Sequence, residues 1–459
     1  MVTCMLMRFS VSNFMSFGYS ENPDGTVKTA EFHLYAGRTE QFKERVMHIN
    51  GRNLLKFASL YGANAAGKTN LTRAIGFGRQ IILSTIEKRD AQDKYCRSKK
   101  ENRDKPTQFE YEFSVGDKCF AYGFTVNLYN KSILSEWLYE LNGSKESTIF
   151  ERLAEKELYY FDESIFSESE NIQQFHFFMK DANRINNSLL LYELNRRKLE
   201  HQDFQVFATV FEWFQKDLIV IYPDTKIGKS YFRFESDKDK LTKILDYLDT
   251  GITDYDMHKI NEEAFREYFS DASLADMFLT RQDKKDKDAL KSILYYGNTL
   301  FELDYGDEKA DGIYKLMFRH GTDESSYEYG EESDGTRRLI ELLDIILNDD
   351  GEKVFIVDEL DRSLHPQMTK KFVETFLKFS KNMNTQLIIT THESNLMDLT
   401  LLRRDEIWFA ERDWDSTTSL YSLEKFKARY DTIAAKNYLS GRYGAVPVFK
   451  DFEYVFGED

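Results

Sequence analysis

Gly62-Ala63-Asn64-Ala65-Ala66-Gly67-Lys68-Thr69 is the stretch of sequence that decides the fold, because it matches every position of the pattern G-x-x-x-x-G-K-[ST]. The mostly apolar segment 54–61 precedes it and predicts a strand, and the apolar spacing of 69–86 predicts a helix. Small residues between a strand and a helix let successive backbone N–H groups surround phosphate oxygens, and the helix N-terminus adds partial positive charge. The stretch therefore predicts a phosphate-binding loop.

The side chains at the end of this loop predict how a nucleotide is held. Lys68 is long enough to reach the β- and γ-phosphates of ATP, and the hydroxyl of Thr69 suits Mg²⁺. We therefore expect ATP and Mg²⁺ as the bound species. The expected nucleotide-binding residues of this segment are Gly62, Ala63, Asn64, Ala65, Ala66, Gly67, Lys68, Thr69 and Asn70.

A second apolar strand ends in two carboxylates, in the run Val354-Phe355-Ile356-Val357-Asp358-Glu359. In open α/β sheets, ligands bind at the carboxyl ends of the strands. Asp358 is the candidate Walker B ligand of Mg²⁺, together with Thr69, and Glu359 is the candidate base that orients or deprotonates the attacking water. A strand often ends in exposed acids, but the phosphate-binding loop upstream supplies the partner that phosphoryl transfer needs.

Apolar runs separated by helical segments predict an α/β fold with a mixed sheet. The runs 354–357 and 387–391 flank a helix expected at 367–379, which indicates parallel strands covered on both faces. The alternating segments 109–115 and 120–126 predict an antiparallel hairpin. We therefore expect a P-loop domain that also carries an antiparallel β lobe.

The length of 459 residues exceeds one ordinary core, so we expect a head domain split by an insertion. The predicted parts are residues 1–152, a mainly helical insertion at 153–299, and residues 300–459. An aromatic stripe in 204–214 repeats at three and four residues, which predicts core packing rather than a ligand site. Its members are Phe204, Phe207, Phe211 and Phe214.

The phosphate-binding loop, Asp358-Glu359 and Thr391-His392 together resemble the ABC-type ATPases of the SMC, Rad50, RecF and OLD group. In that group a histidine after the strand that follows Walker B contacts the γ-phosphate, and the resemblance implies this catalytic role for His392, beside Glu359 and Lys68. The pattern Asn-Phe-x-Ser-Phe within 9–17 and the run Leu364-His365-Pro366 are also typical of the group. The resemblance implies an ABC-type ATPase head.

Ser333-Asp334-Gly335-Thr336-Arg337-Arg338 occupies the position of the signature loop of that group, ahead of Walker B. It departs from the LSGGQ form, and only Ser333 and Gly335 match. The resemblance implies that this loop meets the nucleotide bound by a second copy, so that ATP joins a homodimer, and that Asp361 couples the two sites. From the residues alone, Ser333 or Asp334 is equally a helix N-cap, and both roles can hold at once.

The chain resembles AAA-15-like and AAA-21-like bacterial ATP-binding proteins, and the segment 438–448 resembles AAA-15-like ATPases that are encoded with RloB-type partners in restriction-linked and abortive-infection loci. A packed carboxyl-terminal tail is the alternative. Members of the OLD branch carry a Toprim nuclease after the head, but too few residues follow Ala410 for a domain of about 100 residues. We therefore expect a separate effector, such as a Toprim or RloB-like nuclease, as a partner.

The composition limits the partners and the compartment. The chain has 62 Lys and Arg against 78 Asp and Glu, a formal net charge of −16, so a nucleic-acid partner is not indicated, although a local basic patch could still bind one. The cysteines Cys4, Cys96 and Cys119 are too scattered for a zinc site or a disulfide framework. Without a signal peptide or an apolar run of about 18 residues, we expect a soluble, cytoplasmic protein with no membrane partner.

Three functions compete at this point. The first is an ATP-gated regulatory ATPase of a bacterial anti-phage defence system, and the second is a RecF-like or SMC-like ATPase that acts directly on DNA. The third, a transporter motor subunit, is disfavoured by the large insertion. The acidic balance and the lack of a long heptad array favour the first. A salt-sensitive affinity for bare DNA would favour the second.

Overall fold

The computed structural model describes residues 4–143, 145–225, 238–280, 291–305, 310–322, 325–347, 352–381, 383–426 and 434–447. The chain forms two compact units. The first comprises Met1–Tyr222, Gly351–Leu360 and Leu377–Asp459, and the second comprises Pro223–Asp350 and Asp361–Phe376. These bounds differ from the three segments expected from the sequence, because residues 153–222 belong to the first unit and residues 300–350 to the second.

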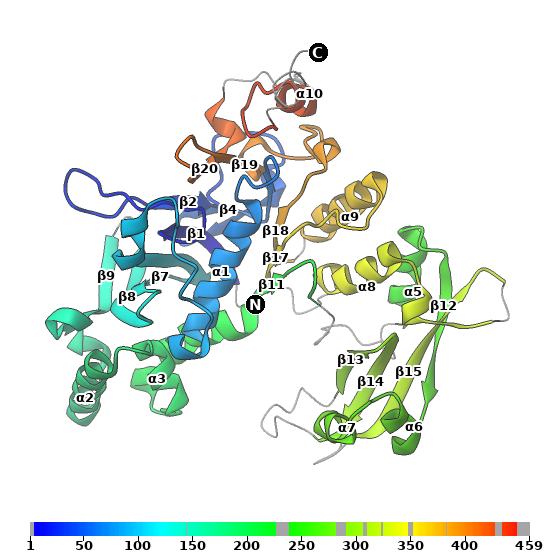
Figure 1. Cartoon of the computed structure of the whole chain (residues 1–459), viewed down its shortest axis with the longest axis horizontal. Coiled ribbons are helices and arrows are strands. Elements are labelled where there is room, and N and C mark those ends of the chain that lie inside the picture. The colour runs from blue at the N-terminus through cyan, green and yellow to red at the C-terminus, as the bar shows by residue number, and fades with distance from the viewer. Residues whose placement is uncertain are drawn as a thin grey trace, which may run out of the picture. The chain divides into compact units, whose positions relative to one another are not determined.

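A six-stranded sheet carries the phosphate-binding loop in the first unit (Figure 1). Its order is β11-β17-β18-β5-β19-β20, and all neighbours are parallel except the antiparallel pair β19 and β20. Every residue of β5, β17 and β18 is buried, as expected for parallel strands covered on both faces. The predicted α/β fold is confirmed. The strands are β5 (Phe57–Tyr61), β11 (Leu218–Ile221), β17 (Val354–Val357), β18 (Gln386–Thr390), β19 (Ile407–Arg412) and β20 (Thr418–Ser422).

The strand expected at 54–61 is divided by Lys56. Residues on one side form β4 (Arg52–Leu55), which pairs with β3 (Val46–Ile49), and those on the other form β5. The Lys56 side chain is buried, and its Nζ donates to the backbone oxygens of Ser380 at 2.6 Å and Met383 at 2.7 Å. These two bonds satisfy a charge that is costly to bury, and burial lowers the pKa of Lys56.

Helix α1 (Lys68–Ile82) follows the loop and packs its apolar face into the main core, together with strands of both large sheets. The helix approaches strand β6 (Thr107–Val115) closely at Gly78, where a Cβ would lie 2.3 Å from the hydroxyl of Tyr111. That hydroxyl donates to the backbone oxygen of Ile75 at 2.7 Å. The glycine thus lets the helix that begins at the loop lie directly on the β lobe.

A seven-stranded sheet with antiparallel neighbours forms the predicted β lobe, in the order β10-β9-β8-β7-β6-β1-β2. The expected hairpin is confirmed, with Val115 opposite Lys118 at its turn. The strands are β1 (Cys4–Ser12), β2 (Ala30–His33), β6 (Thr107–Val115), β7 (Lys118–Asn127), β8 (Ser132–Asn142), β9 (Lys145–Leu153) and β10 (Leu158–Phe161).

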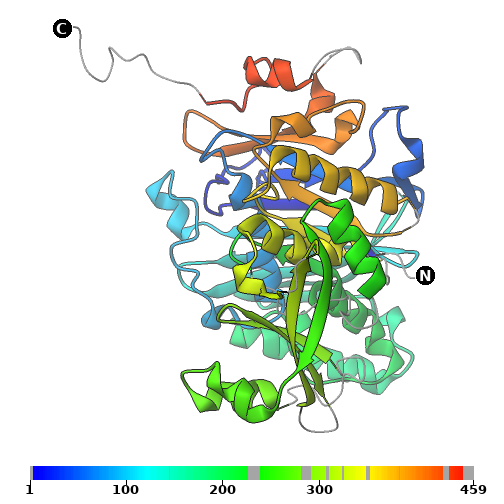
Figure 2. The ribbon, with the colours of Figure 1, turned by 90° about the vertical axis from the view of Figure 1, so that its right-hand side faces the viewer.

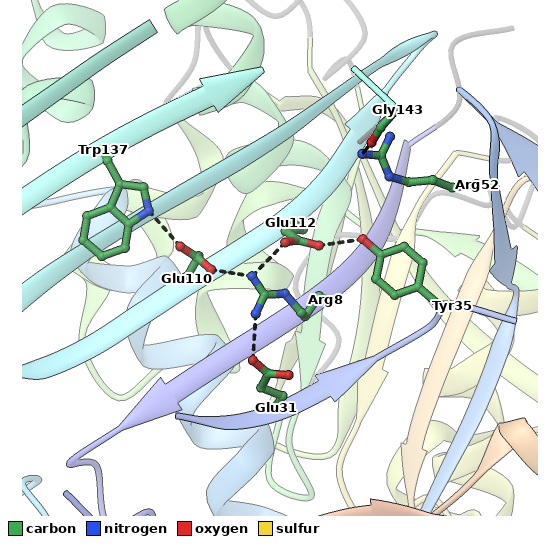
Figure 3. Close-up of polar contacts among 8 residues, drawn as sticks. All are labelled: Arg8, Glu31, Tyr35, Arg52, Glu110, Glu112, Trp137 and Gly143. Carbon is green, nitrogen blue, oxygen red and sulfur yellow. Dashed lines mark hydrogen bonds and ion pairs between the residues drawn. The ribbon is translucent and has the colours of Figure 1, made fainter. Parts of the chain in front are cut away.

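One face of this lobe carries a charged network around Arg8 (Figure 3). Its guanidinium contacts Glu31 at 2.9 Å and both Glu110 and Glu112 at 2.7 Å. The second oxygens of Glu112 and Glu110 are also engaged: Glu112 accepts from the hydroxyl of Tyr35, and Glu110 accepts from the indole of a tryptophan on β8. The network joins β1, β2 and β6 on the face opposite Phe9, which lies in the core.

Helices α2 (Ser169–Ile185), α3 (Leu190–Arg196) and α4 (Gln205–Glu212) belong to the first unit. The predicted aromatic stripe is confirmed as core, since Phe204, Phe207 and Phe214 are buried and Phe211 packs against them. A fully buried ion pair joins the helices to the β lobe. Glu136 accepts from Arg152 Nε at 2.8 Å and from the backbone N–H groups of Leu190 and Leu191.

The second unit contains an antiparallel sheet. Its strands β12 and β13 lie in the segment 153–299, where a mainly helical insertion was expected, and its other strands begin at residue 299 or later. Its order is β12-β15-β14-β13, with β16 also paired to β15. Helices α6 and α7 pack at one end of the sheet, and α5 lies against β12 (Figures 1 and 2). The elements are α5 (Lys238–Tyr247), β12 (Ile252–Lys259), α6 (Glu262–Glu267), α7 (Ala272–Leu279), β13 (Lys291–Tyr296), β14 (Thr299–Tyr305), β15 (Ala310–His320), β16 (Tyr327–Glu328) and α8 (Asp334–Leu347).

Two further helices complete the described chain. The helix expected at 367–379 is α9 (Pro366–Phe379), and α10 (Ala434–Leu439) follows β20. Tyr438 of α10 stacks on Phe409 with ring centroids 5.6 Å apart, so the carboxyl-terminal segment is packed on β19. Val448, the last residue of the segment considered above, lies outside the described residues. Within the described ranges, no helix is both long and apolar enough to cross a membrane.

Candidate nucleotide-binding site

The phosphate-binding loop connects the end of β5 to the start of α1. Its backbone adopts positive φ angles at Ala65 (63°) and Gly67 (110°), a region that favours glycine. A Cβ on Gly67 would lie 2.3 Å from Thr418 Oγ1, and a Cβ on Gly62 would lie 2.5 Å from the backbone oxygen of Ala410. Both glycines of the pattern are therefore required by close approach of the neighbouring strands.

Lys68, the first residue of α1, is buried, and its ammonium group is held over the loop. Its Nζ donates to the backbone oxygens of Gly62 at 2.8 Å and Ala63 at 3.3 Å. The Lys68 ammonium group and the backbone N–H groups therefore belong to the same loop. Such a combination of positive charge and N–H donors suits phosphate oxygens.

The two predicted Mg²⁺ ligands lie together, although 289 residues separate them along the chain. Thr69 Oγ1 donates to Asp358 Oδ1 at 3.3 Å. Asp358 follows the last residue of β17 and is buried, as expected for the carboxyl edge of a parallel sheet. Thr390, at the end of the neighbouring strand β18, donates from its hydroxyl to the same carboxylate oxygen at 2.7 Å.

Glu359 has a left-handed backbone with φ of 50°, which is uncommon for a residue other than glycine. Its N–H donates to the hydroxyl of Thr390 at 2.8 Å, which fixes this turn. The Glu359 side chain is half-buried and His392 is exposed, and both line the same cavity. The structure thus brings together the predicted base, the predicted histidine and the loop.

That cavity has a volume of about 870 Å³ and contains every predicted loop residue from Ala63 to Asn70 in its wall. Three further segments line it that the sequence did not single out as site residues. Tyr95 offers an aromatic ring there, and Arg97 and Arg412 bring two exposed guanidinium groups. The unpredicted lining residues are Met15, Ser16, Asp93, Tyr95, Cys96, Arg97, Ser98, Arg412, Asp415 and Ser416. Of these residues, only Ser16 occupies a defined position of a sequence motif, the Asn-Phe-x-Ser-Phe pattern.

Hydrogen bonds of hydroxyl and amide side chains connect the phosphate-binding loop to neighbouring segments. Asn70 Nδ2 donates to Ser16 Oγ at 2.8 Å, and Thr418 Oγ1 lies 2.7 Å from the same Ser16 oxygen. The Thr418 hydroxyl also donates to the backbone oxygen of Ala66 at 2.9 Å. The N-terminal loop and strand β20 therefore both position the phosphate-binding loop.

Ser333, Gly335 and Asp361 belong to the second unit, and their predicted roles at a nucleotide stay predictions. The N-cap alternative for Ser333 is confirmed, because its hydroxyl accepts from the N–H of Thr336 at 3.1 Å at the start of α8. A Cβ on Gly335 would lie 2.8 Å from the backbone oxygen of Ser363, so this position requires glycine for packing within the unit.

The family model described as "AAA domain, putative AbiEii toxin, Type IV TA system" matches residues 57–398. Among solved structures, the chain resembles the Smc head bound to the C-winged helix domain of ScpA, with 12% identity and a TM-score of 0.40 over 91% of this chain and 97% of that one. It also resembles the SMC head domain from Thermotoga maritima, with 11% identity and a TM-score of 0.34 over 91% of this chain and 98% of that one. At these TM-scores the likenesses carry no functional conclusion. No curated protein matches the sequence.

Proposed function

This chain belongs to the AAA family described as "AAA domain, putative AbiEii toxin, Type IV TA system", and from that membership we propose that it binds ATP with Mg²⁺ and hydrolyses the ATP. The membership confirms the predicted ATPase family. One observation supports the proposed activity most directly: the phosphate-binding loop, Glu359 and His392, which are far apart in sequence, line one cavity.

The residues present suit the nucleotide. The cavity volume of about 870 Å³ falls in the range of small-molecule sites. The loop backbone and Lys68 would hold the phosphates, while the Thr69 hydroxyl and the Asp358 carboxylate, already 3.3 Å apart, would hold Mg²⁺. Bound Mg²⁺ would neutralise charge on the β- and γ-phosphates.

In the proposed reaction, the Glu359 carboxylate accepts a proton from a water molecule while the water oxygen bonds to the γ-phosphorus. The bond from the γ-phosphorus to its bridging oxygen breaks, and ADP and phosphate leave. Lys68 and His392 would stabilise the charge on the transferred group through hydrogen bonds. Thr390 would position the base, because its hydroxyl holds the Glu359 N–H.

We further propose that ATP pairs two copies of the chain. In this arrangement Ser333 and Gly335, at the N-terminus of α8, face the nucleotide held by the other copy, and Asp361 couples the two sites. A capped helix N-terminus carries partial positive charge, which suits a γ-phosphate.

The biological role that we propose is regulation of a separate effector, such as a nuclease, in a cytoplasmic anti-phage defence system. The description of the family, which names a toxin of a toxin–antitoxin system, supports a defence setting. The effector is inferred from the resemblance to ATPases encoded with RloB-type partners.

The test compares two variants with the parent chain. K68A should abolish ATP binding, whereas E359Q should bind ATP normally but lose at least about 100-fold in turnover, since a positioned base contributes that much. With ATP and Mg²⁺, E359Q should also sediment as a dimer. Normal turnover in E359Q would show that Glu359 is not the base. Equal ATP affinity in K68A and the parent would refute the site itself.

A further inference from the structure

Strand β10 (Leu158–Phe161) forms one edge of the seven-stranded sheet, and the proposed ATPase reaction does not use it. It pairs with β9 on one side, and no other strand among the described residues pairs with its free edge. An unpaired edge strand presents a row of N–H and C=O groups to which another extended chain can bond.

The hydrogen-bond register tells which backbone groups of β10 face outward. Asp162 N, directly after the strand, donates to a backbone oxygen of β9 at 3.1 Å. In an antiparallel pair, residues alternate between those bonded to the partner strand and those directed away from it. Tyr160, two residues earlier, and Leu158 therefore bond to β9. Tyr159 and Phe161 direct their N–H and C=O groups toward the free edge.

Helix α2 covers one face of β10. The ring of Phe161 is buried, with its centroid 4.8 Å from that of Phe175 of α2. The hydroxyl of Tyr159 lies 3.1 Å from His176 Nδ1 on the same helix. These contacts hold the strand in place, so its free edge is a fixed part of the first unit.

The other face of β10 carries an exposed apolar patch, formed by Leu153, Leu158 and Tyr160. Leu158 and Tyr160 alternate along the strand, and they are 57% and 58% exposed. Leu153 of β9 lies opposite Leu158 and is 45% exposed. Soluble proteins usually protect an edge strand with lysine or proline, neither of which occurs in β10. Large apolar side chains at an unpaired edge therefore indicate a binding surface.

The surroundings of the strand are acidic. Three acids flank it against one basic residue, Lys156: Glu157 precedes the strand, and Asp162 and Glu163 follow it. Glu151 of β9 lies beside the apolar patch, and within the described part of the chain it has no cationic partner. A partner with basic residues at both ends of its strand complements these charges.

We propose that the free edge of β10 binds an extended segment of another protein, apolar at alternate positions and flanked by basic residues. The segment adds a further strand to the sheet, and its backbone bonds to the outward groups of Tyr159 and Phe161. Its apolar side chains lie beside Leu158 and Tyr160. This inference goes beyond the proposed ATPase activity and does not depend on it.

A second copy of the chain suits this edge less well. If two β10 strands paired antiparallel, Glu157 of each copy would meet Asp162 and Glu163 of the other. Like charges directly opposite each other in a sheet are destabilising. The acids therefore favour a basic partner over self-association.

Fluorescence anisotropy on the full-length chain without nucleotide tests the proposal. The probe is the labelled peptide Arg-Lys-Val-Thr-Val-Thr-Val-Lys-Arg, whose β-branched centre favours an extended chain. It should bind with a Kd below about 500 µM, a modest affinity for a short peptide. The peptide with Glu in place of every Arg and Lys should bind at least about tenfold more weakly, because it carries the same charge sign as the strand's surroundings.

Backbone pairing has its own test. The N–H groups of alternate strand residues point to opposite edges, so only one set of peptide N–H groups can face β10. Two further peptides carry N-methyl groups, one on every Val and the other on every Thr. One of them should lose at least about tenfold in affinity and the other should bind like the unmodified peptide. Equal affinities of the two methylated peptides would refute strand addition.

The double variant L158S/Y160S tests the apolar patch. Both side chains are exposed, so the fold should be kept, and the affinity for the basic peptide should fall at least about fivefold. The matched control is W414A, which removes a 97% exposed ring in the turn between β19 and β20 and should bind like the parent. Hydrogen exchange of the parent should slow in segment 158–162 when the peptide is bound.

The proposal is overturned if the basic peptide does not bind at about 2 mM, if L158S/Y160S binds it like the parent, or if exchange slows only outside segment 158–162. If the parent sediments as a dimer without nucleotide and L158S/Y160S does not, the occupant is a second copy and the basic partner is wrong. A chain that fails to bind or hydrolyse ATP would refute the proposed function and leave the peptide result unchanged.

Discussion

Thr390 Oγ1 lies 2.7 Å from Asp358 Oδ1, and the same hydroxyl accepts the N–H of Glu359 at 2.8 Å. One side chain at the end of β18 therefore fixes both acidic residues at the end of β17. Because Asp358 also accepts from Thr69, the contact connects the two strands to the first turn of α1. The arrangement predicts that this hydroxyl is needed for catalysis rather than for folding.

Replacing Thr390 by Val keeps the shape but removes both hydrogen bonds. We expect the turnover of ATP to fall about 10- to 100-fold, since hydrogen bonds to charged groups contribute about 1.5–3 kcal/mol. The measurement is phosphate release at saturating ATP and Mg²⁺. T390S, which keeps the hydroxyl, should retain most activity. If T390V turned over as fast as the parent, the proposed positioning role of Thr390 would be wrong.

The Thr418 hydroxyl predicts an effect on affinity instead. T418V removes the contacts of this hydroxyl with Ala66 and Ser16. The Kd for ATP should rise about fivefold, which corresponds to the free energy of one ordinary hydrogen bond. Equilibrium titration with a fluorescent ATP analogue measures it. S16A should act through the same contacts, so the double variant should lose less than the sum of the two single changes. Fully additive losses would mean that the two hydroxyls act independently.

The linear motifs of the site could be predicted from the sequence because each motif consists of consecutive residues. The loop Ala63–Asn70, the acids after β17 and His392 each follow a strand whose apolar run is visible in the sequence, and the structure places each of them where its strand ends. Tyr95, Arg97 and Arg412 belong to no such motif. They reach the cavity only because the chain folds back over the loop, which spacing alone does not reveal.

The sheet of the second unit was missed for a physical reason. In β13 the residues Ile293, Leu294, Tyr295 and Tyr296 follow one another directly, so the strand lacks the alternation of apolar and polar residues that marks a half-buried strand. A short apolar run of that kind cannot be told from a buried helical turn by its periodicity. The division of the segment 54–61 at Lys56 was equally hidden, because it depends on backbone oxygens more than 300 residues away.

The network around Arg8 predicts a loss of stability without loss of the site. R8M leaves Glu31, Glu110 and Glu112 without their shared cation, and the free energy of unfolding should fall by about 2–3 kcal/mol, a figure reduced for the partial exposure of the cluster. Chemical denaturation measures it. R8K keeps the positive charge but lacks the forked guanidinium that contacts several carboxylates. Its free energy of unfolding should therefore lie between those of the parent and R8M. Burial raises the pKa of Glu110, so the loss in R8M should shrink in mild acid as that carboxyl gains a proton.

Glu406 predicts how stability depends on pH. The residue is fully buried before β19, its Oε2 accepts from the N–H of Arg403 at 2.8 Å, and its Oε1 has no partner within the described residues. Burial raises the pKa of Glu406 from 4.5 to about 8. Between these values the folded chain keeps a proton that the unfolded chain has lost, so stability must fall as the pH rises through this window, by about 1.4 kcal/mol per unit.

The variant E406Q removes this ionisation, because glutamine is neutral at every pH and has nearly the same shape as glutamate. We expect the parent to lose stability from pH 5 to pH 8 and E406Q to lose markedly less, so that the variant is the more stable protein at pH 8.5. Thermal unfolding at several pH values measures the difference. E87Q, a change at an exposed acid, should follow the parent. If parent and E406Q had parallel stability curves, Glu406 would be ionised in the folded protein, with Arg45 and Arg403 as its counter-charges.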